Sequence, residues 1–213
     1  MAFSGGVDSS LVAWLAHSSF DDSALAALGV SASLAPAQRA AAHSIAEYIG
    51  IELLEVPTLE GSVSGYVAND GNACFHCKVA LYSTLDDVGR GVLATLQDTQ
   101  SPVVLFNGTN ADDLTDPTRV GLVAADKFHV ASPLAGLPKN TVRSLARHVG
   151  LPNWDWAASP CLRSRLQLGV PAEAALLQAV GGAEAAVRRV LGLEASDSMR
   201  VRVMVDGVWW LFS

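Results

Sequence analysis

The chain has 213 residues, 50% of them hydrophobic and 16% charged, with a formal net charge of −7. This length and apolar content can bury the core of one α/β domain plus a small appendage, and they exclude a disordered chain. The negative charge argues against a general nucleic-acid binder, and no apolar run approaches the roughly 20 residues of a membrane-spanning helix. Three cysteines, an odd number, argue against a disulfide framework. The N-terminus lacks the basic segment of a signal peptide, so we expect a cytoplasmic protein without membrane contacts.

Strand-like and helix-like stretches alternate up to Pro152. The predicted helices are residues 11–17, 36–49, 74–88, 92–97 and 139–149, and the predicted strands are residues 2–3, 24–30, 52–57, 103–106 and Val130. Such an alternation predicts an α/β fold with a doubly wound parallel sheet. Helices then cover both faces, and ligands bind beyond the carboxyl ends of the strands.

After Pro152 the pattern breaks. Residues 153–168 are irregular, residues 172–191 have an alanine-rich helical pattern, and an Asp-Gly pair between residues 199–205 and 208–212 favours a hairpin. We therefore predict a first domain over residues 1–157 and a small α+β appendage over residues 158–213.

Both ends of the chain are abrupt. Only three residues precede Ser4, whereas a strand usually has about five or six, and the chain closes on the apolar run 208–212. We expect a sequence that is truncated at both ends. The apolar run suits a subunit interface or an ordinary core strand, and we expect a homo-oligomer.

The most informative segment follows the first strand and reads Ser4-Gly5-Gly6-Val7-Asp8-Ser9-Ser10. Adjacent glycines let a backbone approach a ligand closely, and free N–H groups at a helix start favour an anion. The lysine of the common phosphate loop is absent, which suits enzymes that break ATP between the α- and β-phosphates. A glycine turn that merely caps a helix is the alternative. The string resembles the signature of the PP-loop (N-type) ATP pyrophosphatases, which implies an adenine nucleotide alpha hydrolase-like fold.

A second polar segment follows the predicted strand at residues 103–106 and reads Asn107-Gly108-Thr109-Asn110-Ala111-Asp112-Asp113. Two adjacent carboxylates near a pyrophosphate site are suitable partners for Mg²⁺. A cluster of helix-capping residues is the alternative. Together with the first segment we interpret it as nucleotide-binding. It also resembles a Gly-Thr-Asn-x-Asp-Asp motif of PP-loop amidotransferases and sulfur transferases.

The three cysteines lie in settings that suggest chemistry. Cys74 and Cys77 form a Cys-x-x-Cys pair at a predicted helix start, and Cys161 has Arg163 and Arg165 close by. Helix starts and cations favour a reactive thiolate. A zinc site that includes His76, a redox pair of the first two cysteines, and three inert buried thiols are the alternatives.

The chain as a whole resembles the LarE family, the ATP-dependent pyridinium-dicarboxylate mononucleotide sulfur transferases of nickel-pincer cofactor synthesis. The element Pro-Cys-Leu-x-Ser-Arg at residues 160–165 is more specific than the PP-loop signature, which many families share. The matching segments are residues 3–10, 74–78, 108–113, 132–134, 150–155, 159–165 and 200–202. One departure is Trp156-Ala157, where relatives usually have Lys-Pro; the lost lysine puts substrate or ATP contacts in doubt.

The resemblance implies roles for individual residues. ATP is expected to contact Ser4, Gly5, Gly6, Asp8, Ser9, Ser10, Gly108, Thr109 and Asn110, and Mg²⁺ is expected near Asp8, Asp112 and Asp113. The substrate's phosphate or carboxylates are expected at Ser164, Arg165, Arg200 and Arg202. Strand alternation puts Arg200 and Arg202 on one face, which also describes a plain exposed face.

Cys161 matches the cysteine that attacks the adenylated carboxylate and donates its sulfur. In some members this cysteine becomes dehydroalanine, and in others three cysteines hold a [4Fe–4S] cluster whose open iron carries an extra sulfide. Because this chain has Cys74, Cys77 and Cys161, we expect the cluster type.

The expected function is transfer of sulfur to a small phosphorylated pyridinium nucleotide after adenylation. Residues 1–157 are then the PP-loop ATP-binding domain, and residues 158–213 are the sulfur-transfer loop and a partial substrate-binding domain. The alternatives are a tRNA thiolase, an amide-forming PP-loop synthase and an inactive nucleotide-binding fragment. The net charge of −7 argues against the tRNA enzyme.

Overall fold

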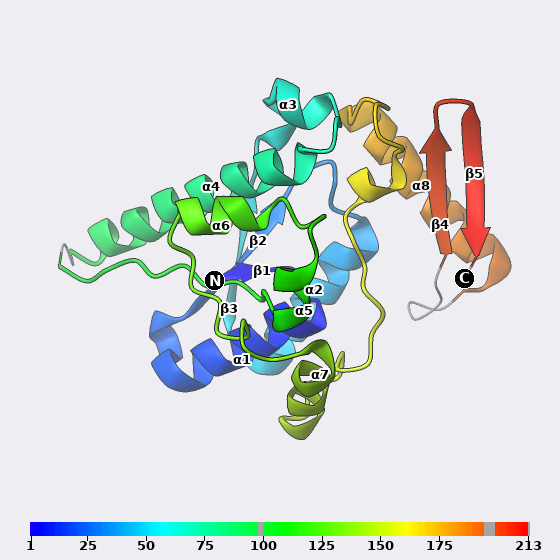
Figure 1. The fold of residues 1–213 in the computed structure, drawn as a ribbon. Helices are drawn as coiled ribbons and strands as arrows, with labels where there is room; N and C mark the ends of the chain where they lie inside the picture. Colours follow the sequence, from blue (N-terminus) through cyan, green and yellow to red (C-terminus); the bar gives the residue numbers. More distant parts are fainter. Residues whose placement is uncertain (98–99, 194–198, 213) are drawn as a thin grey trace.

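The computed structural model describes residues 1–97, 100–193 and 199–212, and of residues 208–212 it describes the backbone only. Its centre is a parallel sheet in the order β1-β2-β3 (Figure 1). The strands are β1 (Ala2–Phe3), β2 (Leu25–Val30), β3 (Glu52–Pro57) and a separate antiparallel pair, β4 (Met199–Met204) and β5 (Gly207–Phe212). The α-helices are α1 (Val7–Phe20), α2 (Pro36–Ile49), α3 (Ser64–Val67), α4 (Ala73–Thr95), α5 (Ala111–Thr115), α6 (Leu122–Lys127), α7 (Lys139–His148) and α8 (Ala174–Leu191). Short 3-10 turns are η1 (Asp21–Ser23), η2 (Glu60–Ser62) and η3 (Leu162–Arg165).

Extended segments widen the sheet on the side of β1 that β2 leaves open. Ala2 N donates a hydrogen bond to Phe106 O at 2.8 Å, and Phe106 forms a parallel bridge with Ala131. The predicted strand over residues 103–106 therefore exists only as one bridge at its end, and the strand predicted at Val130 is a bridge one residue later. The first strand was predicted too long and the second was displaced by one residue. In the described part of the chain, the backbone hydrogen bonds between these two segments join Leu105 and Asn107 to Ala131.

The pleat of β2 separates two hydrophobic cores. Ala26 and Leu28 are buried with residues of α1, α2 and α7, whereas Ala27 is buried with residues of α4 and α6. Successive residues of a strand point to opposite faces of a sheet, so helices cover both faces. The predicted α/β fold with a parallel sheet is confirmed, and it fits a Rossmann-like or PP-loop fold.

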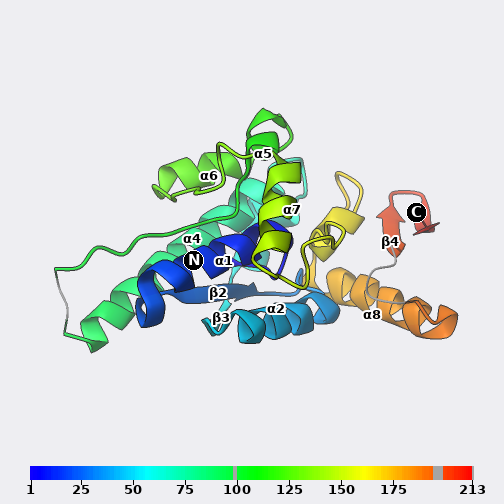
Figure 2. The same cartoon turned by 90° about the horizontal axis from the view of Figure 1, so that it is seen from below.

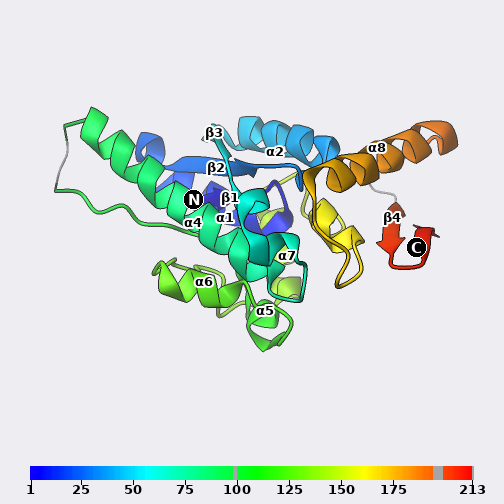
Figure 3. The same cartoon turned by 90° about the horizontal axis from the view of Figure 1, so that it is seen from above.

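The C-terminal part has a third core. Leu177 and Val180 of α8 are buried there with Val201 of β4. This core also contains Tyr66 and Ala73, so the appendage packs against the region where α4 begins. The three ribbon views agree that α8 and the hairpin lie at one end of the molecule, opposite the far end of α4 (Figures 1, 2 and 3). The boundary between residues 157 and 158 stays a prediction.

Several predicted elements match the structure closely, and others do not. The bounds of α2 and β3 are those predicted, whereas α4 is one helix where the sequence predicts two. The helix continues through Gly89 because that glycine packs on Val103, where a Cβ would come within 2.6 Å of Val103 Cγ1. Packing thus outweighs the low helix propensity of glycine. The short helices α3, α5 and α6 were missed because four to six residues show no periodicity.

Two expectations concern what surrounds the protein. Among the residues that the structure describes, no helix combines the length and apolar character needed to cross a bilayer. The expected interface at residues 209–212 depends on side chains that lie outside the described part, and the homo-oligomer stays a prediction.

A buried ion pair holds the appendage together. Arg165 Nε donates to Glu184 Oε1 at 2.8 Å, and the same oxygen accepts Val201 N at 3.1 Å. Both charged residues are less than one tenth exposed, at 5% and 8%. Breaking such a pair leaves an uncompensated buried charge.

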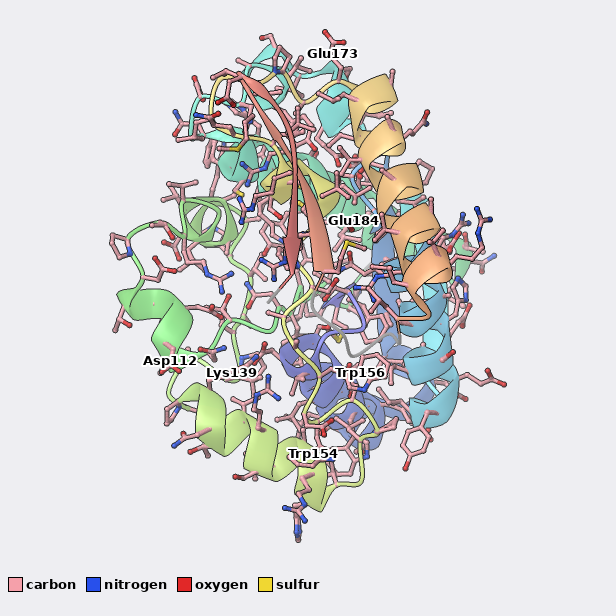
Figure 4. All side chains as sticks on the ribbon, turned by 90° about the vertical axis from the view of Figure 1, so that its right-hand side faces the viewer. Asp112, Lys139, Trp154, Trp156, Glu173 and Glu184 are labelled. Carbon is pink, nitrogen blue, oxygen red and sulfur yellow. The ribbon has the colours of Figure 1, made fainter. Side chains whose placement is uncertain are left out.

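We predict that Glu184→Ala lowers the free energy of unfolding by about 3–5 kcal/mol, measured by urea denaturation followed by circular dichroism. The matched control is Glu173→Ala, because Glu173 is exposed at the start of the same helix (Figure 4) and makes no capping hydrogen bond. The control should change stability by no more than about 1 kcal/mol. Equal effects of the two substitutions would contradict the prediction.

Candidate functional site

Two polar loops leave the carboxyl edge of the sheet side by side. Residues 4–10, the first loop, follow β1, and residues 107–113, the second loop, follow Phe106. Their backbones touch: a Cβ on Gly108 would lie 2.8 Å from Ser9 N and 2.9 Å from Asp8 C. The two segments that the sequence singles out are therefore brought together by the pairing of β1 with the segment at Phe106.

The first loop is a tight turn into α1. Gly5 has a φ of 71°, and a Cβ there would lie 2.8 Å from Ala42 Cα of α2. A side chain at this position would meet both a strained backbone and a neighbouring helix. Gly6 is the N-cap of α1 and makes no side-chain capping bond. The first turn of a helix leaves backbone N–H groups without intrahelical acceptors, which is the arrangement that binds anions.

The three serines of the first loop face different ways. Ser4 is exposed, whereas Ser9 and Ser10 are buried. Ser9 Oγ and Ser10 Oγ donate to Gly6 O at 3.0 and 2.9 Å, and Ser4 Oγ lies 3.1 Å from Ser9 Oγ. Ser10 is fully buried and therefore braces the loop from within. Contact of Ser4, Gly5, Gly6, Ser9 and Ser10 with ATP stays a prediction.

Asn153 also contacts the first loop, and the sequence analysis missed it. Its side chain is fully buried, and Nδ2 donates to Gly5 O at 2.8 Å and to Ser10 Oγ at 2.9 Å. In the described part of the chain, its Oδ1 is buried without a hydrogen-bond partner. The one available signal was its position inside the matching stretch of residues 150–155.

The second loop is held by its own side chains. Asn107 Oδ1 accepts hydrogen bonds from Thr109 N at 3.0 Å and from Ser132 Oγ at 2.8 Å. Asn110 caps α5, because its side chain accepts from the backbone N–H groups of Asp112 and Asp113. The capping interpretation of this segment is therefore confirmed, and nucleotide contacts of Gly108, Thr109 and Asn110 stay predictions.

The carboxylate of Asp8 lies between the two loops. It forms an ion pair with Lys139 Nζ, and its Oδ1 accepts Asn110 Nδ2 at 3.2 Å. Lys139 is the first residue of α7 and was not among the predicted site residues. It places a cation next to the first loop, although the common phosphate-loop lysine is absent from that loop. A lysine that begins a helix was its only sequence signal.

The other two carboxylates lie nearby with different partners. Asp112 accepts the backbone N–H of Lys139 at 3.1 Å, and the two residues lie next to each other in Figure 4. Asp113 accepts Asn110 N at 3.2 Å and forms an ion pair with Arg119 at 2.5 Å. Asp113 therefore has Arg119 as its cationic partner, whereas Lys139 contacts both Asp8 and Asp112.

The fit of Mg²⁺ can be judged from these oxygens. No group of three or more His, Cys, Asp or Glu side chains within residues 1–97, 100–193 and 199–212 is arranged to hold a metal ion. Mg²⁺ usually binds through one or two carboxylates together with phosphates and waters. Asp8 and Asp112 therefore fit an ion that arrives with phosphates, and a site made by protein side chains alone does not fit.

An open groove of about 630 Å³ lies beyond the carboxyl end of β2. Val30 and Ser31 line it from the strand, and Arg39 and His43 line it from α2. Glu55 Oε1 accepts Arg39 Nε at 2.6 Å and lies 2.7 Å from His43 Nε2. These hydrogen bonds, that from Arg39 above all, lower the pKa of Glu55 to about 2. The groove thus combines apolar walls with a fixed set of charges on one side.

Cys161 lies on a segment that is tied to the sheet edge. Leu162 N donates to Ser33 O at 2.8 Å, and Ser33 comes shortly after β2. Ser164 N and Ser164 Oγ donate to Cys161 O at 3.0 and 2.8 Å. The cysteine is therefore held near the end of β2. The hydrogen bonds of Ser164 stabilise the turn that follows Cys161.

Arg163 links this segment to the Cys-x-x-Cys pair. Its Nη2 donates to Cys74 Sγ at 2.8 Å, and its Nη1 donates to Asn69 Oδ1 at 3.1 Å. Asn69 is fully buried and donates to the carbonyls of Gln167 and Val170. The sequence singles out Arg163 as a cation near Cys161, whereas in the structure its guanidinium donates to Cys74.

Cys77 differs from Cys74 in its surroundings. Burial raises the pKa of the Cys77 thiol to about 12; Lys78 opposes this increase, and the charges of Glu60, Cys161 and Cys74 add to it. Cys77 also packs against the third core. It is therefore a neutral thiol at physiological pH in this structure.

The fit of a [4Fe–4S] cluster follows from these positions. All three cysteines are free, and the charges of Cys74 and Cys161 both raise the pKa of Cys77. The three thiols therefore lie in one region. Cysteine thiolates are the ligands that such a cluster needs. However, Arg163 donates to Cys74 Sγ, and the described residues contain no preformed group of three metal-ligating side chains. The donor set fits the cluster, but its spacing in this conformation does not.

The arginines predicted to bind substrate have unequal surroundings. Arg165 is committed to Glu184 and also donates to Pro160 O at 2.9 Å. Burial, together with the charges of Arg165 and Arg202, lowers the pKa of Arg200. Within the described ranges, Arg202 Nε is buried without a hydrogen-bond partner. Arg200 Nη2 donates to Ala158 O at 3.4 Å, three residues before Cys161, and substrate contacts of all three arginines stay predictions.

We predict that Gly108→Ala lowers the free energy of unfolding by about 1–3 kcal/mol, because its Cβ would press on the backbone of Ser9. Thermal unfolding followed by circular dichroism measures the change. Gly136→Ala is the matched control, because a Cβ at Gly136 meets nothing within 4 Å. A variant at Gly108 as stable as the control would mean that the two loops are not in backbone contact.

We predict that iodoacetamide leaves Cys77 unlabelled in the native, reduced protein at pH 8. A thiol whose pKa is about 12 is ionised to only about one part in 10⁴ at that pH. Labelling should increase about tenfold for each pH unit up to the pKa, because the thiolate fraction does. Peptide mass spectrometry measures it, with the denatured protein as control. Labelling of Cys77 at the denatured rate in native protein would contradict its burial.

Comparisons with known proteins add two relatives. No protein-family model matches the chain. The chain is similar to pyridinium-3,5-bisthiocarboxylic acid mononucleotide synthase of Lactiplantibacillus plantarum, with 29% identity over 173 residues. That match covers 79% of this chain and 59% of the synthase, so the chain spans less than two thirds of that enzyme. At this identity the similarity is distant.

A nearer similarity is to the Synechocystis sp. protein named uncharacterized protein slr1717. The two sequences are 38% identical over 192 residues, which cover 89% of this chain and 68% of the cyanobacterial protein. The chain belongs to the same protein family as slr1717.

Proposed function

We propose that the protein is an ATP-dependent sulfur transferase of the LarE type. It would adenylate a carboxylate of a pyridinium mononucleotide and convert it to a thiocarboxylate. The observation that carries this proposal is the hydrogen bond from Leu162 N to Ser33 O, which holds Cys161 at the sheet edge that also carries the first loop. The similarity to the synthase of Lactiplantibacillus plantarum supports the same class of chemistry.

ATP would bind across this edge as a PP-loop substrate. The N-terminal amides of α1 suit its phosphates, and Lys139 supplies a cation beside Asp8. The groove beyond β2 begins at the neighbouring strand end and suits the nucleoside, since its walls are mainly apolar. Asp8 and Asp112 would meet the Mg²⁺ that accompanies the phosphates.

The proposed reaction has two steps, adenylation and sulfur transfer, and the second consists of attack by the thiol followed by elimination. A carboxylate oxygen of the substrate attacks the α-phosphorus of ATP, and pyrophosphate leaves. The mixed anhydride with AMP is a much better electrophile than the carboxylate. The Cys161 sulfur then attacks the acyl carbon and AMP leaves. Elimination breaks the Cβ–Sγ bond of Cys161, its Cα proton is lost, and the sulfur remains on the substrate.

A reusable sulfur source is the alternative for the second step. A [4Fe–4S] cluster held by Cys74, Cys77 and Cys161 would supply an iron able to carry an additional sulfide. The thiols would have to move closer together, and Arg163 would have to release Cys74. No step above depends on the cluster.

The arginine pair of β4 supports an anionic substrate. Burial, with the charges of Arg165 and Arg202, lowers the pKa of Arg200, and among the described residues Arg202 Nε has no hydrogen-bond partner. A phosphate or carboxylate can satisfy a guanidinium through two parallel hydrogen bonds. A small phosphorylated pyridinium dicarboxylate carries such groups, and we propose it as the substrate class.

We predict that Cys161→Ala abolishes sulfur transfer but retains adenylation. Adenylation is measured as substrate-dependent exchange of labelled pyrophosphate into ATP, and transfer as the mass of the thiocarboxylate product. Exchange should remain within about threefold of the wild type, because the thiol acts only after pyrophosphate leaves. Unchanged formation of the thiocarboxylate by the variant would overturn the role of Cys161 as the sulfur donor.

The source of sulfur is decided on protein purified without oxygen. Iron and acid-labile sulfide near four per chain, lost in Cys74→Ala and Cys77→Ala, would identify the cluster route. If the protein holds no iron, the intact mass should show that Cys161 loses its one sulfur in a single turnover. Cys74→Ala and Cys77→Ala should then leave sulfur transfer unchanged. Absence of iron, of this mass change and of pyrophosphate exchange would overturn the sulfur-transfer function.

A further inference from the structure

Asn153 lies far from the first loop in the sequence but makes its deepest contacts there. Its Nδ2 donates two hydrogen bonds to this loop, one to Gly5 O at 2.8 Å and one to Ser10 Oγ at 2.9 Å. The residue has no exposed surface. A side chain this buried, with its donors on a single loop, fixes the conformation of that loop.

The bond to Gly5 O determines where the next amide points. The peptide between Gly5 and Gly6 is planar and trans, so its C=O and N–H point in opposite directions. Asn153 holds the carbonyl toward the interior, and the Gly6 N–H therefore faces the open side of the loop. The partner of the Gly6 N–H is consistent with this direction. The N–H donates to Ser4 Oγ at 3.4 Å, and Ser4 is exposed.

The bond to Ser10 extends the same control to the following peptide. Ser10 Oγ accepts from Asn153 and donates to Gly6 O at 2.9 Å. Two successive carbonyls of the loop are thus held by one hydrogen-bonded chain. The amides at the start of α1 are left as the groups that face outward, where an anion would meet them.

Asn153 is itself fixed by the segment that leads to Cys161. Arg143 of α7 donates to Trp154 O at 3.0 Å and to Trp156 O at 2.8 Å, and Arg147 stacks on the Trp154 ring at 5.0 Å. Figure 4 shows Trp154 beside α7. The residues that follow Asn153 are therefore held against α7, and this fixes the position of its side-chain amide.

We infer that Asn153 is a positioning residue for pyrophosphate binding, which it prepares by orienting the amides of the first loop. The identity of the ligand rests on the proposed function. The residue does not touch the reacting atoms, and its contribution comes from the direction of the Gly6 N–H.

The test compares Asn153→Asp and Asn153→Ala with the wild type. Neither variant can donate to both Gly5 O and Ser10 Oγ, because alanine has no side-chain donor and a carboxyl group has at most one. Isothermal titration calorimetry with Mg²⁺ should give at least tenfold weaker binding of ATP and of inorganic pyrophosphate. AMP, which lacks the β-phosphate, should bind within threefold of the wild type. A general loss of folding would weaken all three ligands together, so the pattern separates positioning from stability.

The matched control is Asn69→Asp. Asn69 is equally buried and also donates from Nδ2 to two carbonyls, those of Gln167 and Val170 at 2.9 and 3.0 Å, but it does not contact the first loop. It should leave ATP and pyrophosphate binding within threefold of the wild type. Equal losses in the control and in the Asn153 variants would overturn the inference.

Amide hydrogen exchange without ligand tests the inference independently of ATP. Residues 4–10 should exchange at least tenfold faster in both Asn153 variants, and those of α7 should be unchanged. Unchanged exchange in the loop would overturn the positioning role, even if ATP binds. If wild-type protein binds neither ATP nor pyrophosphate, the proposed function fails, and the exchange rates still decide whether Asn153 orients the loop.

Discussion

The close approach of two backbones at the carboxyl edge of the sheet is the constraint on which the site depends. Gly108 lies against Ser9 N with no room for a side chain. This contact exists because β1 runs between β2 and the segment at Phe106. A short strand with helices on both faces thus brings together chain segments about a hundred residues apart, and every further group of the site is attached to this meeting point.

The segment of Cys161 is attached from three directions by interactions of different kinds. A backbone hydrogen bond ties Leu162 to Ser33, Arg163 reaches Cys74, and Arg165 is paired with Glu184. Glu184 also accepts a hydrogen bond from Val201 of the third core, so the order of the segment depends on the folding of the appendage. This explains why a site at the sheet edge needs a second packed unit. Removal of either partner of such a buried pair would destabilise the appendage, because the other charge would remain buried without compensation.

Much of this architecture could be predicted from the sequence because it is local. The bounds of α2 follow from Pro36 and Gly50, and the first loop is visible as glycines and serines after a strand. The groups that act across the fold could not be predicted in the same way. Asn153 and Lys139 look like ordinary polar residues until the chain brings them to the first loop. The bridges at Phe106 and Ala131 were overestimated for the same reason, since strand length depends on partners that a local pattern does not contain.

The bond that places the sulfur-bearing segment joins two main-chain groups, the N–H of Leu162 and the C=O of Ser33. Any residue at position 33 provides that carbonyl, and any residue except proline at position 162 provides that N–H. This bond therefore constrains neither side chain, although Leu162 is buried in the third core for a separate reason. Among relatives, the location of the thiol would be preserved by loop length and by the absence of proline, features that a search for invariant side chains does not detect.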